Sequence, residues 1–385
     1  MSIREIHRST LQTWLTQTGL SGGQELALLD LRTETDFGNG APLFATNLPL
    51  PRLEASVRDV VPRQSVRLVL VDGGDGTAAS GAQILERLGY SNLHILAGGV
   101  AAWTVDGGFG LPTFDIPGNV FAGSIRELRA TPSLDAAELQ ALRDEGHDVI
   151  VIDTRTPREF AESHVPGAVN VPGEEILHRF LDNVPNPDTL VVVSCAGLPR
   201  AIIGAQTLVD AQVPNGVALL EDGTVGWTRA SFELESGADR SHTRASASSA
   251  AYGAERVGQL AARAGISIVE RDRVDAWLAE GDSRTTYLLD VRSEQEYEAG
   301  HLAGSISAPG GQLLGVTYRT LATRGARVVL IDDDGTRALT TAYWLQHRGW
   351  DVHVFSGALP GFAAARHEQG VGDSRPSSQL YDTRH

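Results

Sequence analysis

The sequence predicts an α/β protein made of three tandem units, each with a central, mostly parallel sheet flanked by helices. The first observation behind this prediction is length, because 385 residues correspond to about two and a half average domains. The second is the alternation of buried-strand and helix patterns along the chain, which is typical of parallel strands joined by crossover helices. The third is an internal repeat.

The first element of the repeat is a short apolar run followed by Asp-x-Arg, and then by an acid and an aromatic ring. It occurs at residues 26–37 (LALLDLRTETDF), 149–160 (VIVIDTRTPREF) and 286–297 (TYLLDVRSEQEY). The pairs in register are Asp30 and Arg32, Asp153 and Arg155, and Asp290 and Arg292. Uninterrupted β-branched runs such as VIVID predict strands that are buried on both faces.

The second element is another apolar strand that enters a turn and then a helix. Its copies occupy residues 67–90, 190–212 and 327–350. A third element closes each unit with a short strand and a turn that ends in an aromatic residue. Its copies, at residues 94–103, 218–227 and 352–362, end at Trp103, Trp227 and Phe362, which we interpret as core anchors.

Helix signals open each unit, and composition suggests where the units divide. We expect Ser9 to cap a helix over 9–17, Ser133 to open one over 133–146, and residues 269–282 to hold the equivalent third helix. The expected division follows the repeat. It gives domains over 1–118, 119–238 and 255–372, a flexible Ser/Ala-rich linker over 239–254, and a polar tail over 373–385. The alternative for part of this linker is that it lies over a neighbouring domain.

The charged residues exclude several classes of function. The formal charge of −16 argues against nucleic-acid partners and anionic membranes, which require a basic face. All 32 basic residues are arginines, so lysine Schiff bases, pyridoxal phosphate and Walker A loops are excluded. One cysteine, Cys195, allows neither an internal disulfide nor a cysteine zinc site. With no leader peptide or membrane span in the sequence, we expect a cytoplasmic protein.

The second unit carries the motifs of a known family. The stretch DTR…EF…HVPGAVNVP, then VVVSCAGLPRA, then a Gly-x-x-Gly-Trp ending at Trp227, resembles a rhodanese domain. The whole chain resembles a tandem rhodanese-like protein, clearly so in the third unit and more weakly in the first, where APLFATNLP replaces HVPGAVNVP. This resemblance implies a small α/β fold and a loop cysteine that carries a persulfide, with no cofactor.

Cys195 is the candidate nucleophile. It follows the strand LVVVS and precedes Gly197 and a helix that starts near Arg200. Ligands of α/β sheets bind beyond the carboxyl ends of the strands. The loop amides, the helix dipole and Arg200 are each expected to lower the pKa of the thiol. The predicted substrate loop comprises Ala196, Gly197, Leu198, Pro199 and Arg200.

The other two units serve as internal controls. Asp72 and Asp332 stand where Cys195 stands in the second unit, so we predict that the first and third units are catalytically inactive. Their carboxylates would also repel an anionic donor. Asp332, Asp333 and Asp334 form an acidic run that would suit a hard cation, but without further ligands we interpret it as a solvated turn and predict no metal site.

Repetition also separates structural residues from functional ones. The Asp-x-Arg pair occurs in all three units, so we interpret Asp153 and Arg155 as an ion pair that supports the strand end. A second role for Arg155, facing the donor anion, stays open. His164 is matched by His301 in the third unit but by Ala41 in the first, which favours a hydrogen-bonded turn residue over a general base.

The resemblance implies sulfur transfer by a ping-pong route. Cys195 would attack the sulfane sulfur of thiosulfate or of a mercaptopyruvate-type donor, and a thiol, a protein acceptor or cyanide would then remove it. The Cys-x4-Arg spacing is one residue shorter than the loop of related phosphatases and favours sulfur. Two alternatives remain. One is a persulfide carrier with little small-molecule turnover, which the apolar Leu198 and Pro199 favour, and the other is a protein-interaction scaffold without sulfur chemistry.

Overall fold

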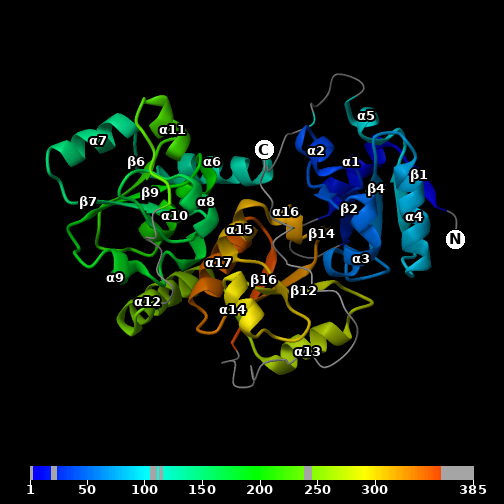
Figure 1. Ribbon diagram of the computed structural model, residues 1–385. Coiled ribbons are helices and arrows are strands. Elements are labelled where there is room, and N and C mark those ends of the chain that lie inside the picture. Colours follow the sequence, from blue (N-terminus) through cyan, green and yellow to red (C-terminus); the bar gives the residue numbers. More distant parts are fainter. Residues whose placement is uncertain (1–2, 19–23, 105–110, 112–115, 238–244, 357–385) are drawn as a thin grey trace.

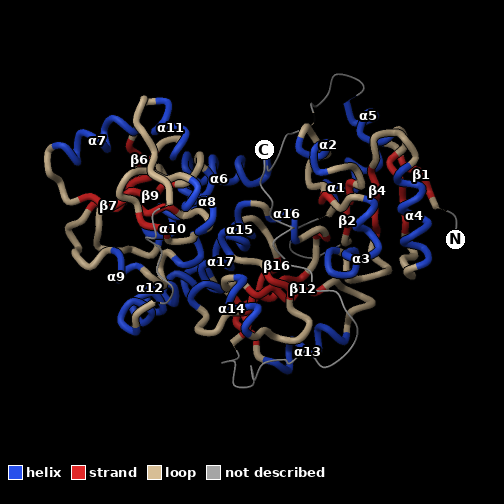
Figure 2. The backbone as a smooth tube through the Cα atoms, viewed as in Figure 1, coloured by secondary structure: helices blue, strands red, loops and turns tan. Residues whose placement is uncertain are grey.

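Three α/β units make up the chain, and the third lies between the other two (Figure 1). The computed structural model describes residues 3–18, 24–104, 111, 116–237 and 245–356. Each unit has its own sheet (Figure 2). Within a unit, every pair of neighbouring strands is parallel. The predicted fold class is therefore confirmed.

The first unit has five strands of its own in the spatial order β1-β5-β4-β2-β3. Its strands are β1 (Arg4–Ile6), β2 (Leu26–Asp30), β3 (Thr46–Asn47), β4 (Arg67–Val71) and β5 (Leu93–Leu96). Its helices are α1 (Arg8–Gln17), α2 (Glu34–Gly38), α3 (Leu50–Val60), α4 (Thr77–Arg87) and α5 (Gly99–Thr104).

The second unit repeats this order as β6-β10-β9-β7-β8. Its strands are β6 (Ser133–Leu134), β7 (Val149–Asp153), β8 (Val169–Asn170), β9 (Leu190–Ser194) and β10 (Val217–Leu220). Its helices are α6 (Ile116–Arg129), α7 (Ala136–Asp144), α8 (Pro157–Glu162), η1 (Gly173–Glu175), α9 (Phe180–Asn183), α10 (Pro199–Asp210) and α11 (Gly223–Arg229), of which η1 is a 3₁₀ turn.

The third unit has the order β11-β16-β15-β12-β13. Its strands are β11 (Ser267–Val269), β12 (Thr286–Asp290), β13 (Ile306–Ser307), β14 (Thr323–Arg324), β15 (Arg327–Ile331) and β16 (Asp351–Phe355). Its helices are α12 (Ala247–Ala264), α13 (Arg271–Ala279), α14 (Glu294–Ala299), α15 (Gly310–Gly315), α16 (Thr317–Thr320) and α17 (Thr336–His347).

The strands of each sheet are buried on both faces, as their continuous apolar runs predict. In β9, Val191 and Val193 pack into one core together with α10, whereas Val192 faces a second core that contains Trp227. Alternation along a single strand therefore fills two apolar layers. Strand β9 lies in the middle of the sheet, and at its carboxyl end the chain turns toward α10.

One strand of the third unit belongs to the sheet of the first. Strand β14 pairs antiparallel with β2, with Thr323 opposite Ala27 and Arg324 opposite Leu26. Nearby, Glu25 accepts hydrogen bonds from the backbone nitrogen and hydroxyl of Thr285, both at 2.7 Å. The two units are thus joined through backbone pairing and a buried carboxylate.

The expected flexible linker over 239–254 is partly wrong. Residues 239–244 lie outside the described residues, but Ser246 caps helix α12, which begins at Ala247. Alanine is the strongest helix former, so this Ser/Ala-rich stretch forms a helix where it finds a surface to cover. Helix α12 covers such a surface on the second unit. Gly253 packs so closely on Leu177 that a Cβ on Gly253 would lie 2.5 Å from the carbonyl oxygen of Leu177.

Two expected helix starts also need correction. Asp135, not Ser133, caps α7, because Ser133 is used in strand β6. His7 precedes α1, so Ser9 lies inside the first turn. In both places a short edge strand ends just before the helix, and the shift is no more than two residues. Within the described residues, no helix is both long and apolar enough to cross a membrane.

Candidate active site

Cys195 lies at the carboxyl end of β9, where the chain leaves the sheet to enter α10. Its backbone is fixed by the turn before α11. The amide of Thr224 donates to the carbonyl of Cys195 at 2.9 Å, and Val225 donates to the carbonyl of Ala196 at 3.4 Å. Gly223 makes this approach possible, since its φ is +51° and a Cβ there would lie 1.9 Å from the Cys195 oxygen.

The thiol is held in a buried cradle of backbone amides. Only 1% of Cys195 is exposed, and the N–H groups of Gly197 and Ala201 point at its sulfur. Pro199 occupies the first turn of α10, where its missing N–H costs nothing. Ala196 to Arg200 are half-buried and form the rest of the loop.

The expected lowering of the thiol pKa is wrong for this closed arrangement. Burial raises the pKa of Cys195 above its ordinary value, because the thiolate would lose its water. The charge of Arg200 and the two amides act in the opposite direction, but burial is the larger effect. The sequence showed the charges and the helix start, but not how deeply the loop is covered.

Arg200 is paired with a carboxylate that the sequence analysis did not single out. Its two terminal nitrogens donate to the two oxygens of Glu159, at 2.8 and 2.6 Å. This pairing lowers the pKa of Glu159 to about 2 although burial opposes it. Glu159 also closes a capping box with Thr156 at the start of α8. The Thr-x-x-Glu spacing is the sequence signal that could have singled out Glu159, as a helix-capping residue.

In the first and third units, a carboxylate occupies the place of the thiol. Asp72 accepts hydrogen bonds from the amides of Gly74 and Ala78, both at 2.8 Å. Asp332 accepts them from the amides of Asp333, Arg337 and Ala338 at 2.8–3.2 Å. The amides that bind Asp72, and the Ala338 amide in the third unit, stand at the positions of the amides that point at Cys195. In each of these two loops a carboxylate therefore occupies the place of the thiol.

The acidic run of the third unit is engaged with cations of the protein itself. Carboxylate oxygens of Asp332, Asp333 and Asp334 lie within 4.8 Å of one another, close enough for a metal ion. However, Arg337 pairs with Asp332 and Asp333, and His178 of the second unit lies 3.0 Å from Asp334. The run therefore works as part of an ion-pair cluster between two units.

The Asp-x-Arg pairs have the same geometry in all three units. Each arginine donates to its aspartate through Nε and Nη2 at 2.6–3.1 Å, and Nη2 also donates to a carbonyl eight residues further on. The carbonyls belong to Gly40, Ser163 and Gly300. Arg155, 4% exposed, is thus held by Asp153 and Ser163 in the structural arrangement of its two counterparts.

His164 is fixed in a turn, as the repeat comparison predicts. Its Nδ1 lies 2.8 Å from the carbonyl oxygen of Phe160, and its ring stacks on Phe160 at 3.9 Å. His301 makes the same two contacts with Tyr297. Trp227 and Trp103 are buried, whereas Phe362 lies outside the described residues.

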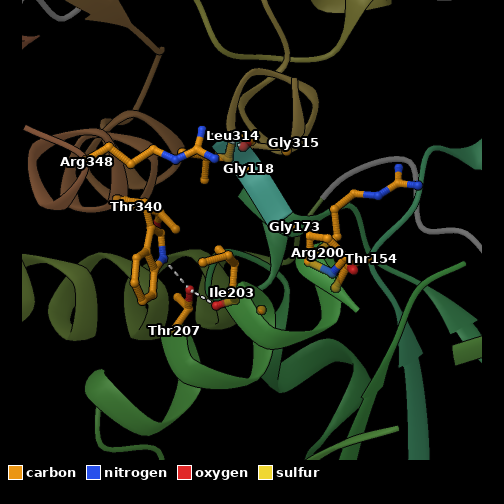
Figure 3. A pocket seen from close by; sticks show the side chains of 14 residues that line it. Gly118, Thr154, Gly173, Arg200, Ile203, Thr207, Leu314, Gly315, Thr340 and Arg348 are labelled. Atoms are coloured by element: carbon orange, nitrogen blue, oxygen red, sulfur yellow. Dashed lines mark hydrogen bonds between the residues drawn. The ribbon is translucent and has the colours of Figure 1, made fainter. Parts of the chain in front are cut away.

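A pocket borders the loop on the side that faces the third unit (Figure 3). Its cavity volume is about 30 Å³. Pro199, Arg200 and Thr154 of the second unit line one side, and Leu314 and Arg348 of the third unit line the other. Cys195 itself is not among the lining residues. No sequence signal pointed to the third-unit side, because the repeat does not show how units pack.

A family model matches each of the three units. The model described as "Rhodanese-like domain" matches residues 14–106, 135–230 and 270–365. The chain is 41% identical to a thiosulfate sulfurtransferase from Pseudomonas aeruginosa, with a TM-score of 0.88. That match covers 97% of this chain and 69% of the other.

A second match is partial. The chain is 27% identical over 110 residues to an HTH-type transcriptional regulator of Mycobacterium tuberculosis (strain ATCC 25618 / H37Rv). The match covers 29% of this chain and 47% of the regulator, so it spans about half the length of that curated relative.

Proposed function

Because this chain belongs to the rhodanese-like domain family, we propose that it is a sulfurtransferase whose second unit forms a persulfide on Cys195. The observation that carries the proposal is the cradle at Cys195. A nucleophilic sulfur faces two backbone amides at the start of α10, which can hold the negative charge of a persulfide. In the other two units a carboxylate already occupies the same cradle.

The first half-reaction loads the enzyme. The Cys195 thiolate attacks the sulfane sulfur of the donor, a new S–S bond forms, and the bond from that sulfur to the rest of the donor breaks. The electron pair leaves with the departing group, which is sulfite from thiosulfate. From a mercaptopyruvate-type donor the departing group is the enolate of pyruvate, which takes up the proton of the donor thiol to give pyruvate. The amides of Gly197 and Ala201 then face the charged outer sulfur.

The second half-reaction unloads it. A thiolate or cyanide attacks the outer sulfur, and the Cys195 thiolate leaves, which restores the starting enzyme. Thiosulfate as donor is supported by the likeness to the Pseudomonas aeruginosa enzyme of that name. The single cysteine supports a reducing, cytoplasmic location.

A persulfide carrier is a second candidate, favoured by one observation. Leu198 and Pro199 are apolar, and burial raises the pKa of the Cys195 thiol. Such a loop suits slow loading and delivery to a protein acceptor better than rapid turnover of small anions.

Intact-protein mass spectrometry tests the proposal. The reduced protein is incubated with thiosulfate and, separately, with 3-mercaptopyruvate, alongside Cys195→Ser. We expect the mass of one added sulfur atom in the wild type and none in the variant. Thiocyanate formation after cyanide is added then separates an enzyme from a carrier. If neither donor adds sulfur, small-molecule sulfurtransfer is refuted.

A further inference from the structure

The second and third units face each other across an approximate twofold axis. Equivalent residues in them are 137 positions apart, as Cys195 is from Asp332 and Arg200 from Arg337. Two hydrogen bonds join equivalent positions directly. Trp344 Nε1 donates to Thr207 Oγ1 at 2.8 Å, and the Gly311 amide donates to Glu174 at 2.8 Å. Contacts between equivalent positions are those expected on a twofold axis, so each loop lies against the other unit.

Around the loop of the third unit, this interface is closed. His178 of the second unit lies 3.0 Å from a carboxylate oxygen of Asp334. Glu175 pairs with Arg337 at 2.9 Å, and the side chain of Arg337 is 3% exposed. Two polar side chains of the second unit, those of His178 and Glu175, therefore cover the third unit's loop.

Around the loop of the second unit, the same interface is open. The position equivalent to His178 is Gly315, which has no side chain. A Cβ at Gly315 would lie 4.0 Å from Cγ and Cδ of Arg200, so a longer side chain there would extend over the loop. The pocket beside Pro199 and Arg200 occupies the space that Gly315 leaves.

The third unit also brings a cation to this pocket. Arg348 lines it and donates from Nη1 to the carbonyl of Leu314 at 2.9 Å and to the hydroxyl of Thr317. Its guanidinium lies over the ring of Phe121, 4.9 Å from the centroid. Figure 3 shows Arg348 extending across the pocket opposite Thr207 and Ile203, while the Arg200 guanidinium is directed away from it.

From this asymmetry, and resting on the proposed function, we propose that the third unit forms one side of the donor-binding site of the second unit. We call this side, made of Leu314, Gly315 and Arg348, the recognition wall. Gly315 leaves room for the sulfur donor, and Arg348 binds the anionic group, sulfonate or carboxylate, at the end of the donor remote from the transferred sulfur. The wall favours small donors with one anionic end. The inactive third unit is therefore a specificity element for its neighbour.

The test measures how Cys195 loading depends on thiosulfate concentration in Arg348→Gln, Arg348→Lys and Gly315→Leu, with the exposed Arg271→Gln as the matched control. We expect Arg348→Gln to raise the half-saturating thiosulfate concentration about tenfold, because one charge-assisted hydrogen bond to the donor is lost. Arg348→Lys keeps the positive charge and should restore part of the affinity for thiosulfate. Gly315→Leu should slow loading several-fold, whereas Arg271→Gln should match the wild type.

A second readout separates charge recognition from a structural role of Arg348. Alkylation of Cys195 by anionic iodoacetate is compared with alkylation by neutral iodoacetamide. Arg348→Gln should lower the iodoacetate-to-iodoacetamide rate ratio, and Gly315→Leu should slow both reagents and keep the ratio. Wild-type half-saturation in both the Arg348→Gln and Gly315→Leu variants, with an unchanged ratio, would overturn the recognition wall. If the wild type does not load at all, the proposed function fails, and the alkylation ratio still decides the role of Arg348.

Discussion

Arg200 and Arg337 hold the same position in the loops of two neighbouring units, yet their partners differ. Arg200 pairs with Glu159, whereas Arg337 pairs with four carboxylates, those of Asp332, Asp333, Glu175 and Glu296. The shared pairs, Arg200 with Glu159 and Arg337 with Glu296, belong to the repeat. The additional partners of Arg337 are Asp332 and Asp333 of its own loop and Glu175 of the second unit. The loop of the third unit therefore holds its own carboxylates and connects to the second unit.

Replacing Glu159 by Gln is expected to make Cys195 more reactive. Glu159 neutralises Arg200, so its removal leaves that positive charge to stabilise the thiolate and lowers the pKa of the Cys195 thiol. Iodoacetamide alkylation at pH 7 should become several-fold faster, and its pH profile should move toward acid. Glu296→Gln, the same change in the third unit, is the control. An unchanged profile in Glu159→Gln would show that Glu159 does not act through Arg200.

A cysteine placed in the third unit is expected to stay unreactive. Asp332→Cys in a Cys195→Ser background keeps Arg337 and its partner Glu296, but Glu175 and His178 still cover the loop. Incubation with thiosulfate should add no sulfur to this variant by mass spectrometry. Sulfur addition at a rate near that of the wild type would show that covering by the second unit does not keep the third unit inactive.

The carboxylate of the first unit's loop is expected to stabilise that unit. Asp72→Ala would leave the buried amide of Ala78 and the exposed amide of Gly74 without their acceptor, at a cost of roughly 2 kcal/mol. Asp75→Ala removes an exposed bond to the amide of Thr77 and should cost clearly less. Denaturant unfolding of both variants measures the difference. Equal losses would argue that the Asp72 cradle has no special role.

Glu174 predicts a pH dependence of stability. Burial, with the nearby charge of Glu175, raises the pKa of Glu174 to about 7 from 4.5. Between these pH values the folded protein keeps a proton that the unfolded chain releases, so the contribution of Glu174 to stability is lost as the pH rises toward 7. The unfolding free energy of Glu174→Gln should therefore rise relative to that of the wild type between pH 4.5 and 7, by up to about 3 kcal/mol. Above pH 7 the difference should stay constant.

The measurement is the difference in unfolding free energy between Glu174→Gln and the wild type across that range. The difference removes the contributions of other titrating groups, since both proteins share them. The glutamine keeps an oxygen for the Gly311 amide, so the hydrogen bond across the interface is preserved. A difference independent of pH would mean that Glu174 titrates normally.

The repeat made most of the fold predictable from sequence, because each unit's strands carry their own burial pattern. It also allowed Asp153 and Arg155 to be interpreted as structural, since the two copies without a cysteine retain the same pair. Contacts between residues that are distant in the sequence could not be predicted from it. Glu159 lies 41 positions before Arg200, and Gly315 and Arg348 belong to another unit.

Two expectations failed because burial and packing outweighed local chemistry. The amides and Arg200 do favour the thiolate of Cys195, but the sequence does not show that the sulfur is covered. The Ser/Ala-rich stretch at the start of α12 has the composition of a linker, yet alanine forms helix readily when one face can be buried. In both cases the missing information was the position of a neighbouring element.

The antiparallel pairing of β14 with β2 has a consequence for synthesis on the ribosome. Residues Leu26 and Ala27 leave the ribosome early, but their partners at 323–324 follow nearly 300 residues later. At 5–20 residues per second, the nascent first unit waits roughly 15–60 s with part of an apolar strand edge unpaired. During that interval the edge is a site for chaperone capture or misassociation. A chain cut before Thr323 would leave this part of the β2 edge without its partner permanently.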